Sequence, residues 1–157
     1  MASVLHDVRI LIVDDHRNMR TLIKAALYGL GFSKLFEAAD GRHALEVMSE
    51  ARPDLVITDF KMPEMNGLDF VTELRRDAAN PFTEVPVIML TGHTDLHVVR
   101  ACLRAGVNEF LAKPFTAQAL LDRIRRCAEE DRPFIRSAAY TGPWPRMSQV
   151  EGLSEAS

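Results

Sequence analysis

The feature that most constrains the fold of this 157-residue chain is a regular alternation of short apolar runs with longer amphipathic stretches. The short runs are four to six residues long and mostly apolar, and they occupy residues 9–13, 35–38, 55–58, 85–90 and 109–112. In the stretches that follow them, apolar side chains recur at steps of three and four, which is the spacing of one helix face. Five strands alternating with five helices predict an α/β fold with a doubly wound parallel sheet, covered by helices on both faces.

Charge and hydropathy are those of an ordinary soluble protein. The 19 basic and 22 acidic side chains give a net charge of −3, which lacks the basic excess that nucleic-acid binding requires. No run approaches the ~18 consecutive apolar residues of a membrane span, and the N-terminus has neither the basic nor the apolar region of a signal peptide. The two cysteines, Cys102 and Cys127, are too few for a disulfide framework. We therefore expect a cytoplasmic protein with no nucleic-acid partner and no membrane partner.

Polar side chains that can bind an ion follow four of the five predicted strands. In a doubly wound sheet, ligands bind beyond the carboxyl ends of the strands, so side chains at these ends are expected to lie close together. The residues found there are Asp14 and Asp15 after the first strand, Asp59 after the third, Thr91 after the fourth and Lys113 after the fifth. Carboxylates a few ångströms apart repel one another by roughly 1–4 kcal/mol per pair unless a cation lies between them. Because oxygen ligands suit Mg²⁺, the sequence predicts a magnesium site at this edge.

Each of these residues also has a simpler structural interpretation. Asp15 could cap the following helix, and Thr91, which precedes a glycine, could stabilise a turn. Asp59 could be an ordinary turn residue, and Lys113 could be a solvated lysine. Since all four simple interpretations would have to hold together at one sheet edge, a functional site is the better interpretation.

The motifs around these residues resemble the receiver domain of bacterial two-component response regulators, and in particular the single-domain, CheY-like type. The resemblance extends over about residues 6–130, the whole of the predicted fold. It implies a flavodoxin-like sheet with strand order 2-1-3-4-5 and a cis peptide bond between Lys113 and Pro114. The motifs that carry it are Asp14-Asp15, Asp59, Thr91 and Lys113-Pro114, with Met62-Pro63 and Asn66-Gly67 after the central aspartate.

The resemblance implies that Asp59 accepts a phosphoryl group from a histidine kinase or a phosphotransfer protein. An aspartate carboxylate can act as a nucleophile in this way and form an acyl phosphate. Lys113 and Thr91 are then expected to bind the phosphoryl oxygens. Such a protein catalyses only its own phosphorylation and dephosphorylation, so it is a signalling protein rather than an enzyme with an external substrate. The implied Mg²⁺ ligands are Asp14, Asp15, Asp59 and the backbone carbonyl of Lys61.

The same resemblance implies a switch formed by Thr91 and Phe110. Thr91 moves toward the phosphoryl group and leaves space for Phe110, at a position on the fifth strand where the family often has a tyrosine. The face formed by the fourth predicted helix, the fifth strand and the fifth predicted helix is expected to change in response. This switch face is expected to bind a downstream protein of unknown identity or a second copy of the chain.

Three other functions use related folds or chemistry. Aspartyl-phosphate hydrolases of the haloacid dehalogenase type carry a D-x-D motif after the first strand, whereas this chain has Asp14-Asp15-His16 there. An FMN protein of the flavodoxin type needs a hydroxyl- and glycine-rich loop at the same place, where the two acids would repel a phosphate. A receiver-fold scaffold that binds a partner without being phosphorylated stays open as the alternative.

Residues 131–157 show no helical or strand period and are rich in proline, glycine and serine, so we expect a partly disordered C-terminal tail without an output domain. Phe134, Ile135, Tyr140 and Trp144 are nevertheless too apolar for a purely solvated segment. One interpretation is that Phe134 and Ile135 pack over the end of the last predicted helix while the rest is loose. The other is that the aromatic segment reaches across the switch face and gates its contacts.

Overall fold

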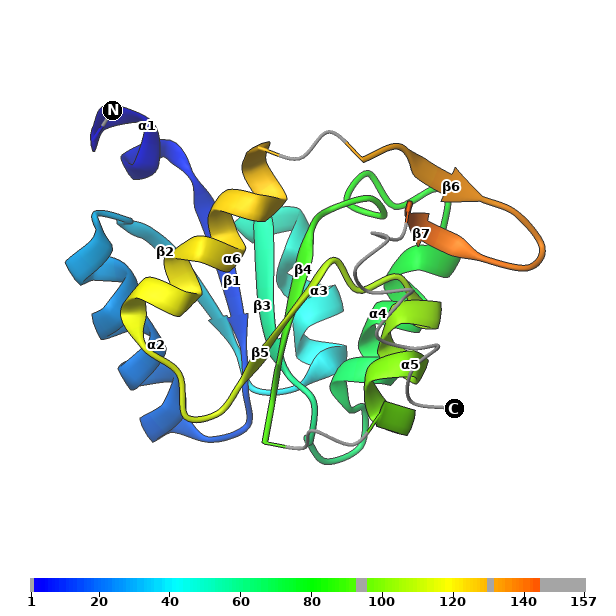
Figure 1. Ribbon diagram of the computed structural model, residues 1–157, viewed down its shortest axis with the longest axis horizontal. Helices are drawn as coiled ribbons and strands as arrows, with labels where there is room; N and C mark the ends of the chain where they lie inside the picture. The colour runs from blue at the N-terminus through cyan, green and yellow to red at the C-terminus, as the bar shows by residue number, and fades with distance from the viewer. Residues whose placement is uncertain (1, 93–95, 130–131, 145–157) are drawn as a thin grey trace.

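The computed structural model describes residues 2–92, 96–129 and 132–144, and five parallel strands form the centre of this part of the chain. The strands lie in the order β2-β1-β3-β4-β5, so the predicted doubly wound sheet of order 2-1-3-4-5 is confirmed (Figure 1). Their bounds are β1 (Arg9–Val13), β2 (Lys34–Ala38), β3 (Leu55–Asp59), β4 (Val87–Thr91) and β5 (Glu109–Ala112). β4 begins after Pro86, later than predicted, because proline has no N–H to donate to a neighbouring strand.

Six helices are present in the described residues, one more than the sequence predicted. The additional helix is the first, which has only six residues before β1 and is too short to show a helical repeat. The other five correspond to the predicted helices. α2 and α6 cover one face of the sheet, and α3, α4 and α5 cover the other (Figure 1). The bounds are α1 (Ala2–Asp7), α2 (Arg17–Leu30), α3 (Gly41–Ala51), α4 (Gly67–Arg76), α5 (Leu96–Ala105) and α6 (Ala117–Glu129).

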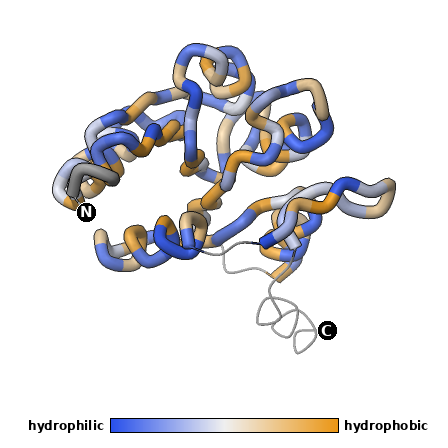
Figure 2. The backbone as a smooth tube through the Cα atoms, turned by 90° about the horizontal axis from the view of Figure 1, so that it is seen from above, coloured by the Kyte–Doolittle hydropathy of each residue, from blue (hydrophilic) through white to orange (hydrophobic). Residues whose placement is uncertain are grey.

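Alternate residues of the central strands enter two separate hydrophobic layers. In β1, Ile10 and Ile12 pack in the layer that contains α2 and α6, whereas Leu11 and Val13 pack in the layer that contains α3, α4 and α5. All four side chains are buried. The covering of both faces explains why these strands are apolar throughout rather than at every second position. Along the outer helices, by contrast, hydrophobic and hydrophilic residues alternate (Figure 2).

Beyond α6 the chain forms a β-hairpin where the sequence predicted no regular structure, and that prediction is wrong for residues 134–143. β6 (Phe134–Arg136) pairs antiparallel with β7 (Thr141–Pro143), and the hairpin lies beside α4 and α5 (Figure 1). Strands of three residues are too short to show a period, and β7 also includes glycine and proline. Their pairing depends on tertiary contacts, so the sequence pattern did not reveal it.

Among the described helices, none combines the length and the apolar character needed to cross a membrane.

Candidate functional site

The ion-binding residues that follow the strands meet at the carboxyl edge of the sheet. The strand order places β1, β3, β4 and β5 side by side, so Asp14, Asp15, Asp59, Thr91 and Lys113 reach the same edge. All of them except Asp14 line a single surface depression, and Asp14 is fully buried. The structure therefore brings together the five side chains that the strand ends indicated.

Lys113 is positioned between two of the carboxylates. Its Nζ lies 2.8 Å from Oδ1 of Asp59 and 3.8 Å from Oδ2 of Asp14. The backbone N–H of Lys113 donates to the carbonyl oxygen of Thr91 at 2.9 Å, which joins β5 to β4 beside the site. The Lys113–Pro114 peptide bond is cis, as the family resemblance implied. The ammonium group thus lies where it can neutralise negative charge added to Asp59.

Asp14 is the most deeply buried carboxylate of the cluster. Its Oδ1 accepts a hydrogen bond from the backbone N–H of His16 at 2.8 Å, while its Oδ2 is buried with no hydrogen-bond partner in the described part of the chain. Burial is the main cause that raises the pKa of Asp14, and the nearby charge of Asp59 raises it further. The hydrogen bonds from His16 and the charge of Lys113 act in the opposite direction. A cation at Oδ2 would offset the cost of burying this charge.

The composition of the cluster suits a hard divalent cation. One ligand atom from each of Asp14, Asp15, His16 and Asp59 lies within 4.8 Å of the others. Three of these residues offer carboxylate oxygens, which are the ligands that Mg²⁺ prefers, whereas imidazole is a ligand for transition metals. Together with Oδ2 of Asp14, which accepts no hydrogen bond from the described residues, this set of donors fits Mg²⁺.

His16 is a site residue whose contacts the sequence did not reveal. Its Nδ1 lies 3.3 Å from Oδ1 of Asp14 and 3.2 Å from Oδ1 of Asp15, and its side chain is 71% exposed. It occupies the N-cap position of α2, but its side chain makes no capping hydrogen bond. The only signal in the sequence was its place directly after the acid pair.

The N-terminus of α4 packs directly against the backbone of Asp59, and Gly67 makes this approach possible. A Cβ atom on Gly67 would overlap the carbonyl oxygen of Asp59. The N–H of Gly67 donates to the carbonyl oxygen of Phe60 at 2.9 Å, and Oδ1 of Asn66 caps the helix by accepting from the N–H of Asp69 at 2.8 Å. The Asn66-Gly67 pair therefore sets the position of the loop that follows the central aspartate.

We expect Gly67→Ala to lower the free energy of unfolding by about 2 kcal/mol or more, because the added methyl group forces β3 and α4 apart. Urea unfolding followed by circular dichroism measures the change. Gly29→Ala in α2 is the matched control, since nothing lies within 4 Å of a Cβ there. Alanine at this helical position should stabilise the protein by roughly 0.5–1 kcal/mol. Equal effects of the two substitutions would contradict the close approach at Gly67.

Asp14→Asn should raise the free energy of unfolding of the metal-free protein by on the order of 1 kcal/mol, because it removes a buried charge close to Asp59. In the wild type, the raised pKa means that the folded state binds the Asp14 proton more tightly than the unfolded state does. Stability conferred by this proton is present below the ordinary pKa of 3.8 and is lost as the pH rises through the raised value.

Urea unfolding in EDTA across this pH range checks the prediction for Asp14. In the wild type the free energy of unfolding should fall as the pH rises through the raised pKa of Asp14, and the variant should lack this fall. Mg²⁺ should stabilise the wild type more than the variant. An asparagine variant that is less stable than the wild type at neutral pH in EDTA would show that the charge at Asp14 stabilises the fold.

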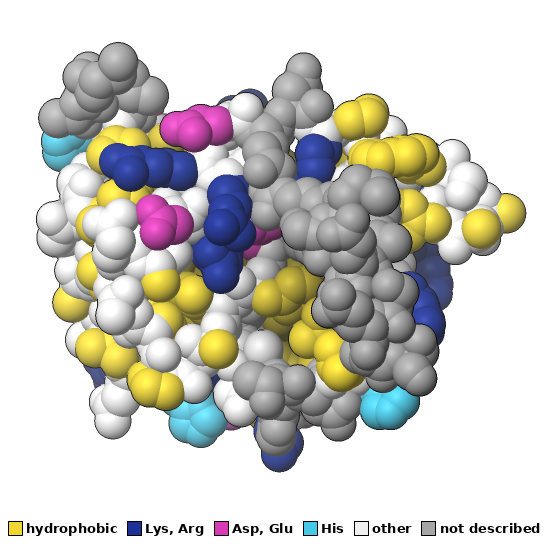
Figure 3. Space-filling model, in the orientation of Figure 1, with side chains coloured by type: hydrophobic (Ala, Val, Ile, Leu, Met, Phe, Trp, Pro, Cys, Tyr) yellow, Lys and Arg dark blue, Asp and Glu magenta, His cyan; other side chains and the backbone are white. Residues whose placement is uncertain are grey.

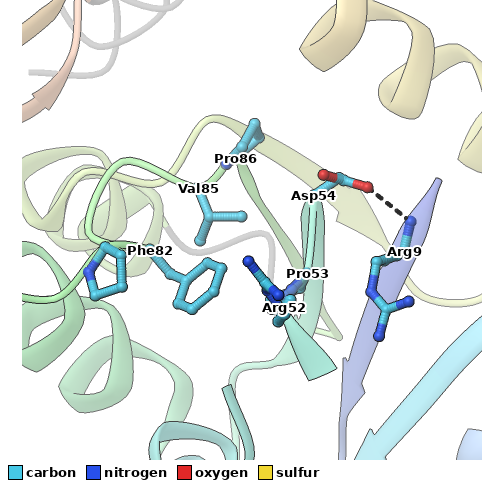
Figure 4. A pocket seen from close by; sticks show the side chains of 8 residues that line it. Arg9, Arg52, Pro53, Asp54, Phe82, Val85 and Pro86 are labelled. Carbon is cyan, nitrogen blue, oxygen red and sulfur yellow. Dashed lines mark hydrogen bonds between the residues drawn. The ribbon is translucent and has the colours of Figure 1, made fainter. Parts of the chain in front are cut away.

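A second depression lies at the opposite, amino-terminal edge of the sheet (Figure 4). Its lining includes Arg9, Arg52 and Phe82, and Asp54 is the single carboxylate among its described lining residues. Oδ2 of Asp54 accepts a hydrogen bond from the backbone N–H of Arg9 at 2.9 Å (Figure 4). This depression therefore lacks the crowded carboxylates that distinguish the site at the carboxyl edge.

Phe110 lies on β5, apart from the site depression. It is half-buried, it is in register with Met89 of β4, and it packs against the hydrophobic layer that contains α3, α4 and α5. Its carbonyl oxygen accepts a hydrogen bond from Nε of Arg123 on α6 at 2.7 Å. The face that includes α6 carries Lys and Arg side chains next to hydrophobic ones (Figure 3).

Fold and site together define a flavodoxin-like α/β protein with an acidic, cation-compatible cluster at the carboxyl edge of its sheet. The family model of the response regulator receiver domain matches residues 10–125, so the chain belongs to the response regulator receiver family. The family assignment made from the sequence motifs is confirmed.

Individual relatives and solved structures agree with this assignment. Chemotaxis protein CheY1 of Helicobacter pylori is 42% identical over 118 residues, which are 74% of this chain and 94% of the relative. The crystal structure of a putative response regulator from Chloroflexus aurantiacus matches with a TM-score of 0.70 and 30% identity, over 77% of this chain and 97% of that one. A chain of the crystal structure of the CheX–CheY–BeF3–Mg complex from Borrelia burgdorferi matches with a TM-score of 0.67 and 27% identity, over 75% of this chain and 87% of that one.

Proposed function

We propose that this chain is a response regulator whose receiver domain, residues 6–130, accepts a phosphoryl group on Asp59. The phosphodonor in this proposal is a histidine kinase or a phosphotransfer protein, and Mg²⁺ is the cofactor. The observation that carries the proposal is the arrangement of Lys113, 2.8 Å from Asp59, beside the buried Asp14, whose Oδ2 has no hydrogen-bond partner among the described residues. Membership of the response regulator receiver family supports it.

In the proposed reaction, a carboxylate oxygen of Asp59 attacks phosphorus, the bond from phosphorus to the leaving group breaks, and an acyl phosphate forms. Lys113 then gives up its ion pair with Asp59 and pairs with a phosphoryl oxygen, and the hydroxyl group of Thr91 donates a hydrogen bond to another phosphoryl oxygen. Bound Mg²⁺ supplies the charge neutralisation that lets a carboxylate approach a phosphoryl group. The proposed ligands of this ion are Asp14, Asp15, Asp59 and the backbone carbonyl of Lys61.

The proposed output is a change in the surface formed by α5, β5 and α6, which corresponds to the switch face expected from the sequence. Phosphorylation adds about −1.5 to −2 charge and three strong acceptors. Thr91 moves toward these acceptors, and Phe110 moves into the space that Thr91 leaves. The equilibrium between the conformations of the switch face shifts as a result. A downstream protein or a second copy of this chain then binds there. The CheX–CheY complex of Borrelia burgdorferi supports partner binding by proteins of this kind.

Incubation of the full chain with acetyl phosphate and Mg²⁺ tests the proposal. We expect one phosphoryl group per chain by intact-mass spectrometry, stable in acid, labile in base and not formed in EDTA. No labelling in the presence of Mg²⁺ would contradict phosphorylation and would favour the receiver-fold scaffold that binds its partner without modification.

A further inference from the structure

The C-terminal hairpin and its flanks, residues 132–144, form a strap beside α4 and α5 (Figure 1). Within the strap, the backbone N–H of Ser137 donates to the carbonyl oxygen of Tyr140 at 2.9 Å. The hydroxyl group of Tyr140 donates to the carbonyl oxygen of Pro143 at 2.6 Å. An isolated two-stranded hairpin is at best marginally stable in water, so contacts with the rest of the protein must hold the strap in place.

The strap docks over Arg75 of α4, which is only 2% exposed. Its Nη1 donates to the carbonyl oxygens of Thr83 and Val85, both at 2.7 Å. Nε and Nη2 donate to the carbonyl oxygen of Gly106 at 3.1 and 2.9 Å, and Nη2 also donates to Oδ1 of Asn108 at 3.0 Å. One buried guanidinium group therefore joins α4 to the segment before β4 and to the turn between α5 and β5.

Two strap residues complete the surroundings of Arg75. The ring centroid of Phe134 lies 5.3 Å from Cζ of Arg75 and 5.7 Å from Cζ of Arg136. Arg136 donates from Nη1 to the carbonyl oxygen of Arg75 at 2.9 Å and from Nη2 to Oγ1 of Thr83 at 3.0 Å. The strap is thus bonded both to α4 and to the segment before β4.

The strap also reaches β5, the strand that carries Phe110. Nη2 of Arg132 donates to the carbonyl oxygen of Asn108 at 3.0 Å and lies 3.8 Å from Oε2 of Glu109. Nη1 of the same side chain donates to the carbonyl oxygen of Trp144 at 3.2 Å. The N-terminal end of the strap is therefore held by Asn108 and Glu109, the two residues that directly precede Phe110.

A backbone contact links β7 to the end of α5. A Cβ atom on Gly106 would lie 2.7 Å from the carbonyl oxygen of Thr141, and a Cβ atom on Gly142 would lie 2.7 Å from Cα of Gly106. These distances are shorter than real Cβ contacts, so glycine at both positions permits the two backbones to touch.

The strap lies beyond the part of the chain that the family model of the receiver domain matches. The match to the receiver domain ends at residue 125. CheY1 of Helicobacter pylori is covered over 94% of its own length, although only 74% of this chain takes part in the match. The strap therefore follows the matched receiver domain in the sequence.

We propose that the strap is an intramolecular lock, which holds α5 and β5 against α4 and opposes the rearrangement of the switch face. The proposal rests on the proposed phosphorylation of Asp59. The strap can keep its bonds to Arg75, Thr83 and Asn108 only while α4, the segment before β4 and β5 keep their relative positions. A shift of α5 and β5 breaks some of these contacts, so docking of the strap competes with the phosphorylated arrangement. Such coupling is reciprocal, so loosening the strap must favour phosphorylation.

Hydrogen–deuterium exchange on the full chain, with and without Mg²⁺ and beryllofluoride as a phosphoryl mimic, tests the lock. Strap peptides, whose N–H groups at Ser137 and Trp144 are hydrogen-bonded, should exchange at least about fivefold faster with the mimic bound. Peptides that contain Asp59 should become protected in the same samples. This protection, titrated with beryllofluoride, reports the affinity for the mimic.

Arg136→Ala removes the bonds to Arg75 and Thr83 and should tighten binding of the mimic at least about fivefold. Phe134→Ala should act in the same direction. Arg42→Ala, which changes an exposed arginine on α3, outside the switch face and the strap, is the matched control and should leave the affinity unchanged. Circular dichroism verifies that each variant is folded.

Three outcomes overturn the lock. If the Asp59 peptides become protected while strap exchange stays the same, the lock is wrong and the proposed phosphorylation stands. If both strap variants bind the mimic with wild-type affinity, the lock is also wrong. If no peptide responds to the mimic, the proposed function is wrong, and the lock that depends on it is wrong as well.

Discussion

Asp59→Asn should abolish phosphorylation by acetyl phosphate, with labelling reduced at least about 100-fold, because an amide oxygen is a far poorer nucleophile than a carboxylate. The fold should survive the change. Oδ1 of Asp59 accepts hydrogen bonds from the backbone N–H of Phe60 at 2.9 Å and from Nζ of Lys113 at 2.8 Å, and an asparagine oxygen can accept both. Intact-mass spectrometry measures the labelling, and circular dichroism monitors the fold.

Asp54→Asn is the matched control for Asp59→Asn. Asp54 directly precedes the same strand, but it lies at the opposite edge of the sheet, where it accepts the Arg9 N–H (Figure 4). This variant should be phosphorylated at the wild-type rate. Labelling of the Asp59 variant at the wild-type rate would place the phosphoacceptor elsewhere.

Arg75→Ala should lower the free energy of unfolding by about 3 kcal/mol or more. The substitution leaves the buried carbonyl oxygens of Thr83, Val85 and Gly106 without their guanidinium donor, and each unsatisfied buried group costs about 1–3 kcal/mol. Burial lowers the pKa of Arg75 to about 10, so the guanidinium group is still protonated at neutral pH and donates all of these bonds. Urea unfolding at neutral pH, followed by circular dichroism, measures the loss.

Arg76→Ala provides the comparison, because Arg76 is the next residue of α4, its side chain is 71% exposed and its ion pair is with Glu73 on the same helix. Exposed pairs of this kind contribute little, so we expect a change within about 0.5 kcal/mol. Arg75→Lys should be intermediate, because an ammonium group keeps the charge but cannot reach all the acceptors of a guanidinium fork. A loss below about 1 kcal/mol for Arg75→Ala would show that water replaces the missing donor.

Much of the fold could be predicted because strands and helices bury their side chains with different periods. The run from Ile10 to Val13 is apolar at every position since both faces of β1 are covered, and this pattern distinguishes it from the helices. The order of the strands did not follow from this pattern, because periodicity carries no information on which strands are neighbours. It came from the resemblance to a family, and the structure confirms it.

The candidate site was predictable for a related reason. Parallel strands all end at one edge, so residues as distant in sequence as Asp14, Asp59 and Lys113 reach that edge together, and the strand order then places them side by side. The contacts of His16 with the acids were not predictable, because they depend on the side-chain conformation at the start of α2. Similarly, the need for glycine at position 67 depends on how closely α4 approaches the backbone of Asp59.

The sequence by itself determined the class of fold, the five side chains at the carboxyl edge and the family, because each of these is encoded in local periods and in residues at strand ends. Only the tertiary structure decided the conformation of the segment after α6. Its two short strands have no local preference strong enough to predict them, and they are held by long-range bonds of Arg132 and Arg136 and by the ring of Phe134 over Arg75. An arginine in an amphipathic helix is normally solvent-exposed, and Arg75 is buried because a segment about sixty residues further along the chain folds back to cover it.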